Sequence, residues 1–261
     1  VLNTINGQYI TTDDMGCSAS DMNDLRKLTP YARGVLYNGE QIPATSFGVY
    51  QAIKASLYYC EKRHSLAGLK VLVQGLGKVG FQLCQYLYDQ GCMLYVDDLN
   101  EALVRRAVLL FQAKPMKLSD ITSQSIDIFC PCAVGGVVNS DLLARLKMRY
   151  IIGGANNPLD HEGLAEELHA KNIIYLPDFI SNAGGVIDIA CEGPQYCKQF
   201  VFERTSIIYA ETVRVLTQSK EENESPLSVA RQMAREKIRA RAHFKQTPVT
   251  SDLQQGELVY A

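Results

Sequence analysis

The pattern of apolar and polar positions changes at Lys70, and from there onward it predicts strands and helices in turn. Continuous apolar runs predict strands, because a strand inside a parallel sheet is buried on both faces. The predicted strands are 70–74, 93–96, 113–116, 126–130, 150–153 and 173–176. The predicted helices between them are 79–90, 100–111, 139–146 and 162–170. This order predicts an α/β fold with a doubly wound parallel sheet and helices on both faces.

Helical periodicity also flanks the alternating region. Upstream, residues 45–59 place Val49, Ile53 and Leu57 on one apolar side of a helix. Downstream, two more helices are predicted at 196–218 and 227–241, separated by a polar run. A glycine-rich turn is predicted at 182–185, and the last residues, 246–261, lack periodicity and are expected to form a mobile tail.

Three glycines follow the first predicted strand at the spacing G-x-G-x-x-G: Gly75, Gly77 and Gly80. Glycines at these positions permit a tight turn and a close approach of the backbone to a diphosphate. The backbone N–H groups of Lys78 and Val79, which open the next helix, would hold the phosphate oxygens. Because a strand precedes the glycines and a helix follows them, the segment predicts a Rossmann-type dinucleotide-binding unit. A glycine turn in another kind of α/β protein is the alternative.

Length and charge narrow the class of partner. The 261 residues suffice for one large domain, or for a nucleotide domain with part of a second. A net charge of −2 with 47% apolar residues predicts a small-molecule partner and no nucleic acid. No apolar run approaches the roughly 20 residues that span a bilayer, so we expect a cytoplasmic protein without a membrane segment. The chain starts at Val1 without a folding unit before it, which predicts that part of the protein lies upstream.

The cysteines and histidines predict no metal site. The eight cysteines form no C-x-x-C pair, and the four histidines stand at no zinc-ligand spacing. Reduced thiols packed inside apolar elements are therefore expected.

Six ordered segments now match one family: 10–16, 43–50, 74–80, 130–136, 153–158 and 177–186. On these motifs the chain resembles the amino-acid dehydrogenases of the glutamate/leucine/phenylalanine/valine superfamily, and most of all the leucine dehydrogenase branch. The resemblance implies two domains with the active site between them. It predicts the end of a substrate domain at 1–44, an NAD-binding domain at 45–195, returning C-terminal helices at 196–245 and a tail at 246–261.

The family reaction is the reversible, NAD-dependent conversion of an L-amino acid to its 2-oxo acid and ammonia, with hydride passing from Cα to nicotinamide. The resemblance implies a homo-oligomer, and it places Asp14 as the aspartate that moves a proton at the substrate nitrogen. The family's two catalytic lysine motifs are not found in this chain. We therefore expect the chain alone to bind NAD without catalysis, and a non-catalytic dinucleotide-binding module remains the alternative.

The resemblance also assigns contacts around the nicotinamide. Thr45 is implied to contact the cofactor, although by its own context it reads as a helix cap. Cys132 and Ala133 are implied to line the nicotinamide side through their backbone. Asn156 is implied to hydrogen-bond the substrate or the nicotinamide ribose.

Two further assignments concern selectivity. Asp98, rather than Asp97, falls in register with the family's ribose-binding acid, which favours NAD over NADP because a carboxylate repels a 2′-phosphate. Val186 and Ile189 match the wall against the substrate side chain, which favours leucine, valine or isoleucine over glutamate. Core packing is the competing interpretation of this pair. Departures from the family at Asp188 leave an aromatic substrate, phenylalanine or tryptophan, as an alternative.

Overall fold

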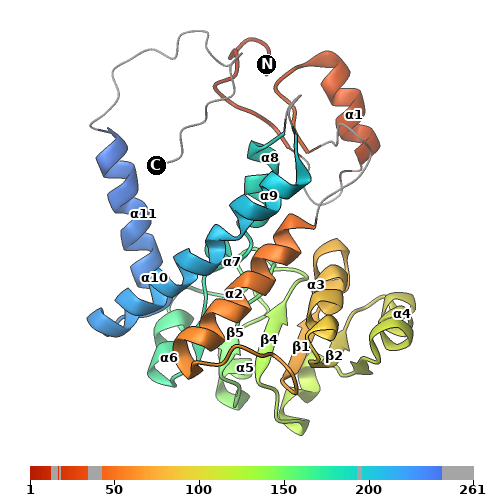
Figure 1. The fold of residues 1–261 in the computed structure, drawn as a ribbon, viewed down its shortest axis with the longest axis vertical. Helices are drawn as coiled ribbons and strands as arrows, with labels where there is room; N and C mark the ends of the chain where they lie inside the picture. Colours follow the sequence, from red (N-terminus) through yellow and green to blue (C-terminus); the bar gives the residue numbers. More distant parts are fainter. Residues whose placement is uncertain (13–16, 18, 35–42, 193–195, 243–261) are drawn as a thin grey trace.

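A computed structural model describes residues 1–12, 17, 19–34, 43–192 and 196–242. Its centre is a six-stranded sheet with the order β3-β2-β1-β4-β5-β6, in which every pairing is parallel (Figure 1). The strands are β1 Lys70–Gln74, β2 Met93–Asp97, β3 Lys114–Pro115, β4 Ile128–Pro131, β5 Tyr150–Ile151 and β6 Ile174–Tyr175. The predicted doubly wound parallel sheet is thus confirmed.

The central strand β1 lies where the strand order reverses. Its neighbours β2 and β4 lie on opposite sides of it in the sheet. Their pairing with β1 sets Gln74 beside both Asp97 and Pro131. In sheets of this kind, ligands bind outside the carboxyl ends of the strands at such a switch point. A ligand of this sheet is therefore expected to contact the residues that follow Gln74, Asp97 and Pro131.

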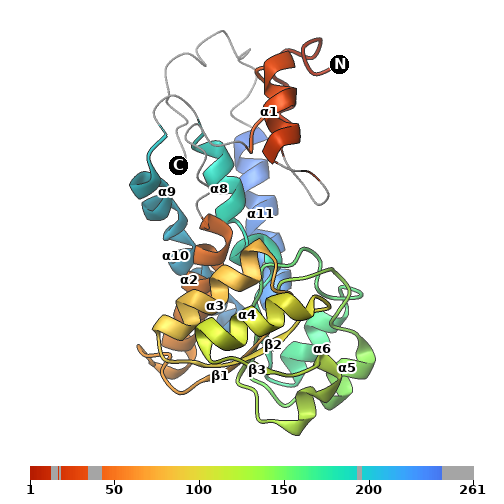
Figure 2. The same ribbon diagram turned by 90° about the vertical axis from the view of Figure 1, so that its right-hand side faces the viewer.

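Helices cover both faces of this sheet. The longer helices are α1 Ala19–Leu28, α2 Ala44–Glu61, α3 Lys78–Asp89, α4 Glu101–Phe111, α9 Lys198–Thr205, α10 Ile207–Glu222 and α11 Pro226–Ala242. The shorter ones are η1 Leu118–Ser123, α5 Ser140–Arg145, α6 Leu164–Ala170, α7 Asp178–Ser181 and α8 Gly184–Ala190. Figure 2 shows α3 and α4 on one side of the strands and α5 and α6 beyond the other.

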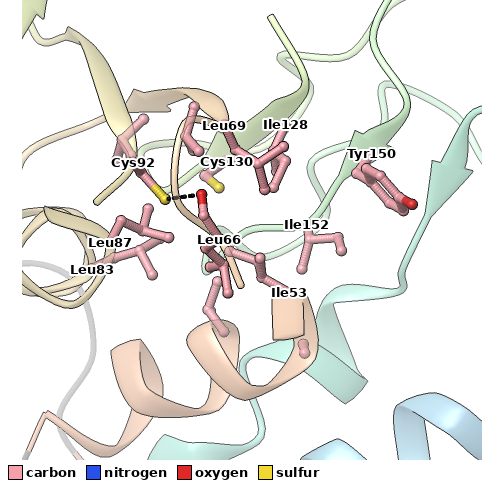
Figure 3. Close-up of a cluster of buried hydrophobic side chains, with 14 of the residues drawn as sticks. Ile53, Leu66, Leu69, Leu83, Leu87, Cys92, Ile128, Cys130, Tyr150 and Ile152 are labelled. Atoms are coloured by element: carbon pink, nitrogen blue, oxygen red, sulfur yellow. Dashed lines mark hydrogen bonds between the residues drawn. The ribbon is translucent and has the colours of Figure 1, made fainter. Parts of the chain in front are cut away.

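Alternate strand residues supply two hydrophobic cores. Val71 and Val73 of β1 join the core under α2, α3 and α10, whereas Leu72 between them joins the core under η1, α5 and α6. Figure 3 shows part of the first core, where Ile53 of α2 and Leu83 of α3 approach the strands. This burial on both faces explains why β1 reads as a continuous apolar run.

The downstream helices differ from the prediction in one place. The single helix predicted at 196–218 is wrong, because α9 ends at Thr205 and α10 begins at Ile207. The hydroxyls of Thr205 and Ser206 donate to the carbonyls four residues earlier, over 2.8 and 2.9 Å. Such side-chain bonds compete with the helix ladder and are associated with bends.

The predicted glycine-rich turn at 182–185 is also wrong in part, because α8 begins at Gly184. A Cβ on Gly184 would lie 2.0 Å from the carbonyl oxygen of Ala44, so glycine lets α8 pack directly against the start of α2. Neither α1 nor α7 is predicted from periodicity. Among the described residues, no helix is both long and apolar enough to cross a bilayer.

Candidate functional site

The three glycines after β1 differ in their surroundings. Gly75 has a φ of +91°, and a Cβ there would lie 2.7 Å from Ala133. A Cβ on Gly80 would lie 1.8 Å from the carbonyl oxygen of Gly75, so α3 can pack on the loop only without a side chain. Gly77 has open space, with nothing within 4 Å of the position of a Cβ. The first and third glycines therefore serve the fold, while the second keeps a surface clear.

The N-terminus of α3 opens onto that clear surface. Gly77 is its N-cap residue and offers no side-chain cap, so the first N–H groups of the helix have no side-chain partner at the cap. Ser46 of α2 donates to the carbonyl of Val79 over 2.9 Å, which fixes the first turn. Fixed N–H groups at the positive end of a twelve-residue helix suit an anion such as a diphosphate.

Asp98 follows β2 and reaches the same loop. Its carboxylate accepts from the backbone N–H of Leu76 over 2.5 Å and from that of Asn100 over 2.7 Å. The carboxylate of Asp97 instead accepts from the N–H of Leu118, at 2.8 Å, at the start of η1. Of the two acids, Asp98 is thus the one held against the glycine loop.

Apolar side chains in the segments after β2 and β4 are open to water. Leu99 is fully exposed, and Val134, after β4, is 61% exposed. Large apolar side chains left in water at the carboxyl end of a parallel sheet offer surface for a flat ring.

The segments after β4 and β5 meet the loop from the other side. The N–H of Cys132 donates to the carbonyl of Gln74 over 2.7 Å, which places Cys132 and Ala133 next to the glycines. A Cβ on Gly154 would lie 2.6 Å from Val79, so this turn packs closely on α3. Burial raises the pKa of the Cys132 thiol to about 12, and the thiol is therefore uncharged at neutral pH.

Asn156 and α8 complete the arrangement. The side-chain amide of Asn182 donates to Oδ1 of Asn156 over 2.7 Å. Four residues further along, Val186 is 71% exposed, and Ile189 is partly exposed. Val186 and Ile189 stand three residues apart and therefore share one face of α8, whereas Asn182 is the C-cap residue of α7, two residues before α8 begins. Core packing, the competing interpretation of Val186, does not account for a side chain so open to water.

Thr45 lies near the same helix. Its Oγ1 would be 2.7 Å from a Cβ on Gly185, which places it against the first turn of α8. Its alternative interpretation as a helix cap is wrong, because α2 begins at Ala44, its N-cap residue is Pro43 and no side-chain cap bond forms. Thr45 is therefore inside the helix, with its hydroxyl directed toward α8.

Two of the sequence assignments fall on residues that the structure does not describe. Asp14 lies outside the described residues, as does the predicted tail at 246–261. Among the residues that the structure does describe, no group of three His, Cys, Asp or Glu side chains could hold a metal ion.

Sequence reasoning missed Ser46, Asn182 and Gln74. Ser46 and Asn182 orient Val79 and Asn156. Gln74, at the end of β1, has a buried Oε1 without a hydrogen-bond partner in the described part of the chain. Asn182 opens the predicted glycine-rich turn at 182–185, just before α8, and its place in that turn is the signal that could have identified it. No comparable signal identified Ser46.

Comparison with known proteins gives a consistent result. A family model described as Glutamate/Leucine/Phenylalanine/Valine dehydrogenase matches residues 96–245. The leucine dehydrogenase of Bacillus subtilis is 36% identical over 250 residues, which cover 93% of this chain and 69% of that protein. The L-tryptophan dehydrogenase of Nostoc punctiforme is 35% identical over 239 residues, or 91% of this chain and 68% of that protein.

Solved structures agree with the sequence relatives. The crystal structure of L-tryptophan dehydrogenase from Nostoc punctiforme superposes with a TM-score of 0.81 and 32% identity, over 93% of this chain and 71% of that one. The chain therefore belongs to the glutamate/leucine/phenylalanine/valine dehydrogenase family.

Proposed function

We propose that this chain carries the NAD-binding part of an enzyme that oxidises an L-amino acid with an aliphatic side chain to the 2-oxo acid and ammonia. The observation that carries the proposal is the clear surface at Gly77, bounded by the N-terminus of α3 and by the carboxylate of Asp98. A dinucleotide needs these two features together, one for its diphosphate and one for its ribose. The membership in a family of amino-acid dehydrogenases supports the reaction class.

Each residue has a role in this proposal. The N–H groups of Lys78 and Val79 hold the diphosphate, and Asp98 accepts hydrogen bonds from the adenosine ribose. Thr45 and the backbone of Cys132 and Ala133 orient the nicotinamide, a ring that accepts the hydride when the cofactor is bound. Asn182 donates a hydrogen bond to the side-chain oxygen of Asn156, Oδ1. This leaves the side-chain N–H groups of Asn156 to donate to a ribose or a substrate.

The substrate side chain is proposed to lie against Val186 and Ile189, where an apolar face favours leucine, valine or isoleucine. Asp14 is proposed to move a proton at the substrate nitrogen, as the family resemblance implies. We also propose that 1–44 ends a substrate domain, that 45–195 is the NAD-binding domain and that 196–245 returns to the first. A cytoplasmic homo-oligomer completes the proposal.

An aromatic amino acid is the second candidate substrate. The identity to L-tryptophan dehydrogenase, 35%, is close to the 36% identity to leucine dehydrogenase. The exposed Val186 leaves an apolar surface that an aromatic ring could also cover.

Cofactor binding and turnover test the proposal separately. NAD at about 100 times its dissociation constant should stabilise the fold by roughly 2.7 kcal/mol, measured as a shift of the thermal unfolding midpoint. NADH formation should then be measured with aliphatic and aromatic amino acids, on this chain and on the longest protein that its gene encodes. Silence of the longest form with every amino acid would overturn the enzyme and leave a non-catalytic dinucleotide-binding module.

Replacing Asp98 with serine should reduce the preference for NAD over NADP by at least roughly tenfold, or about 1.4 kcal/mol. The change removes the charge that repels a 2′-phosphate and the acceptor that receives the Leu76 N–H. The measurement is the ratio of the two dissociation constants by titration calorimetry. Asp97→Asn is the matched control, because Asp97 supports η1 and should leave the ratio unchanged.

A further inference from the structure

Glu192 joins two parts of the chain that are far apart in sequence. Its Oε1 accepts a hydrogen bond from the backbone N–H of Gly34 over 2.8 Å. Gly34 lies in the segment that follows α1, whereas Glu192 lies two residues beyond the end of α8. Figure 2 shows α1 and the N-terminal segment above α8, on the opposite side from the sheet.

The loop that Glu192 holds is paired with another segment. The N–H of Thr11 donates to the carbonyl of Tyr31 over 2.9 Å, and the N–H of Arg33 donates to the carbonyl of Thr11 over 2.8 Å. Fixing Gly34 thus also fixes Thr11, after which the sequence runs into the segment that carries Asp14. Glu192 therefore connects this N-terminal segment to the helix that bears Val186 and Ile189.

Charged groups surround Glu192, but they do not satisfy both oxygens of its carboxylate. Arg26 of α1 and Arg33 of the loop attract its carboxylate, whereas Asp188, one turn earlier on α8, repels it. The hydroxyl of Tyr196 donates its hydrogen bond to the carboxylate of Asp188, over 2.6 Å. The second oxygen of Glu192, Oε2, is buried and has no hydrogen-bond partner among the residues that the structure describes. A buried carboxylate oxygen without a partner is costly, and such an atom calls for an explanation.

We propose that Glu192 is a positioning residue, which fastens the N-terminal segment to the end of α8 and so sets the separation between that segment and the substrate wall. The importance of Glu192 for catalysis rests on the proposed function, whereas the attachment of the N-terminal segment to α8 does not depend on it. Glu192 touches no reacting atom in this account, because it acts through Gly34 and the pair formed by Thr11 and Ala32.

The fastening should depend on pH. Burial, followed by the opposing effects of the Gly34 N–H and the two arginines, leaves the pKa of Glu192 raised above its usual range. The folded state therefore favours the neutral acid, and the stabilisation is present below the usual pKa and lost as the pH rises through the raised one. Glutamine has the shape of the neutral acid and keeps an acceptor for the Gly34 N–H. In Glu192→Gln the N-terminal segment should therefore stay attached to α8 at high pH as well.

Hydrogen exchange of the full chain tests the proposal, with peptides that cover 9–12 and 29–34 as reporters and a peptide over β1 as reference. Glu192→Ala should speed exchange in the reporters about fivefold relative to wild type, with the reference unchanged. The matched control is Glu203→Ala on α9, which loses only a bond to Gln199 on the surface. Glu192→Gln should retain the protection at about pH 8 and show no excess loss between about pH 5 and pH 8.

Several outcomes would overturn the proposal. Exchange in Glu192→Ala that matches Glu203→Ala would overturn it. Exchange that is equally fast in the β1 reference would also overturn it, because Glu192 would then be a general contributor to stability. Glu192→Gln could also lose protection as fully as Glu192→Ala. The NAD-induced thermal shift of Glu192→Ala should stay at the wild-type value; a wild-type chain without that shift contradicts the proposed function and leaves the fastening untouched.

Discussion

Gly77→Asp should abolish NAD binding while the protein without ligand remains as stable as wild type. Gly77 is the N-cap of α3, and nothing lies within 4 Å of the position of a Cβ there. Aspartate is among the best N-cap residues, and its charge complements the helix dipole. The same charge would occupy the surface where a diphosphate must approach, so the added carboxylate repels the ligand.

Thermal unfolding with and without NAD measures both effects. At a concentration where wild type gains roughly 2.7 kcal/mol, Gly77→Asp should gain nothing measurable. Gly77→Asn is the matched control, because it has nearly the same shape and capping ability without the charge. It should bind better than the aspartate variant and less well than wild type. A wild-type shift in Gly77→Asp would show that the dinucleotide does not lie on this helix.

Gly80→Ala should have the opposite pattern and destabilise the fold itself. The added Cβ would lie 1.8 Å from the carbonyl oxygen of Gly75, which is backbone and cannot rotate away. The loop or α3 must therefore shift. We expect a loss at the upper end of the roughly 1–3 kcal/mol that overpacking costs, or a midpoint lower by about 6–12 °C.

Calorimetric unfolding of Gly80→Ala beside Gly77→Ala measures this difference between two glycines of one motif. Gly77→Ala should lose less than about 1 kcal/mol, since it gives up only part of its N-cap preference. Equal stability of the two variants would mean that α3 does not pack on the loop as closely as the contact between Gly80 and Gly75 indicates.

The sheet could be predicted because its strands are buried on both faces. Val71, Leu72 and Val73 contribute to two different cores, so the sequence shows an unbroken apolar run instead of an alternation. The glycines after it carry their own signal, because each is required by a contact or a clear surface. Predictions for this region therefore agreed with the structure from Lys70 to Asp97, to within one residue at the end of each element.

Elsewhere, local preferences pointed away from the structure. Gly184 and Gly185 suggest a turn, yet α8 begins there because close packing against Ala44 outweighs the low helix propensity of glycine. The break between α9 and α10 depends on hydroxyl bonds from Thr205 and Ser206, which periodicity does not report. α1 has only a small core around Met22, Leu25 and Ala32, which gives a weak apolar pattern.

The candidate site follows the same division. Gly75, Gly77 and Gly80 could be chosen from their spacing after a strand, because that spacing is set by the geometry of the turn. The choice of Asp98 over Asp97 required the family resemblance. Asn156 required the family resemblance, and its partner Asn182 required the structure. Residues that orient another residue across a long sequence separation leave no pattern that a single sequence can show.

A crystal structure of the chain with NAD would show directly where the dinucleotide lies. We expect diphosphate oxygens on the N–H groups of Lys78 and Val79, with the adenosine ribose on the carboxylate of Asp98. Diphosphate bound away from the start of α3, or a ribose that contacts Asp97 in place of Asp98, would contradict this expectation.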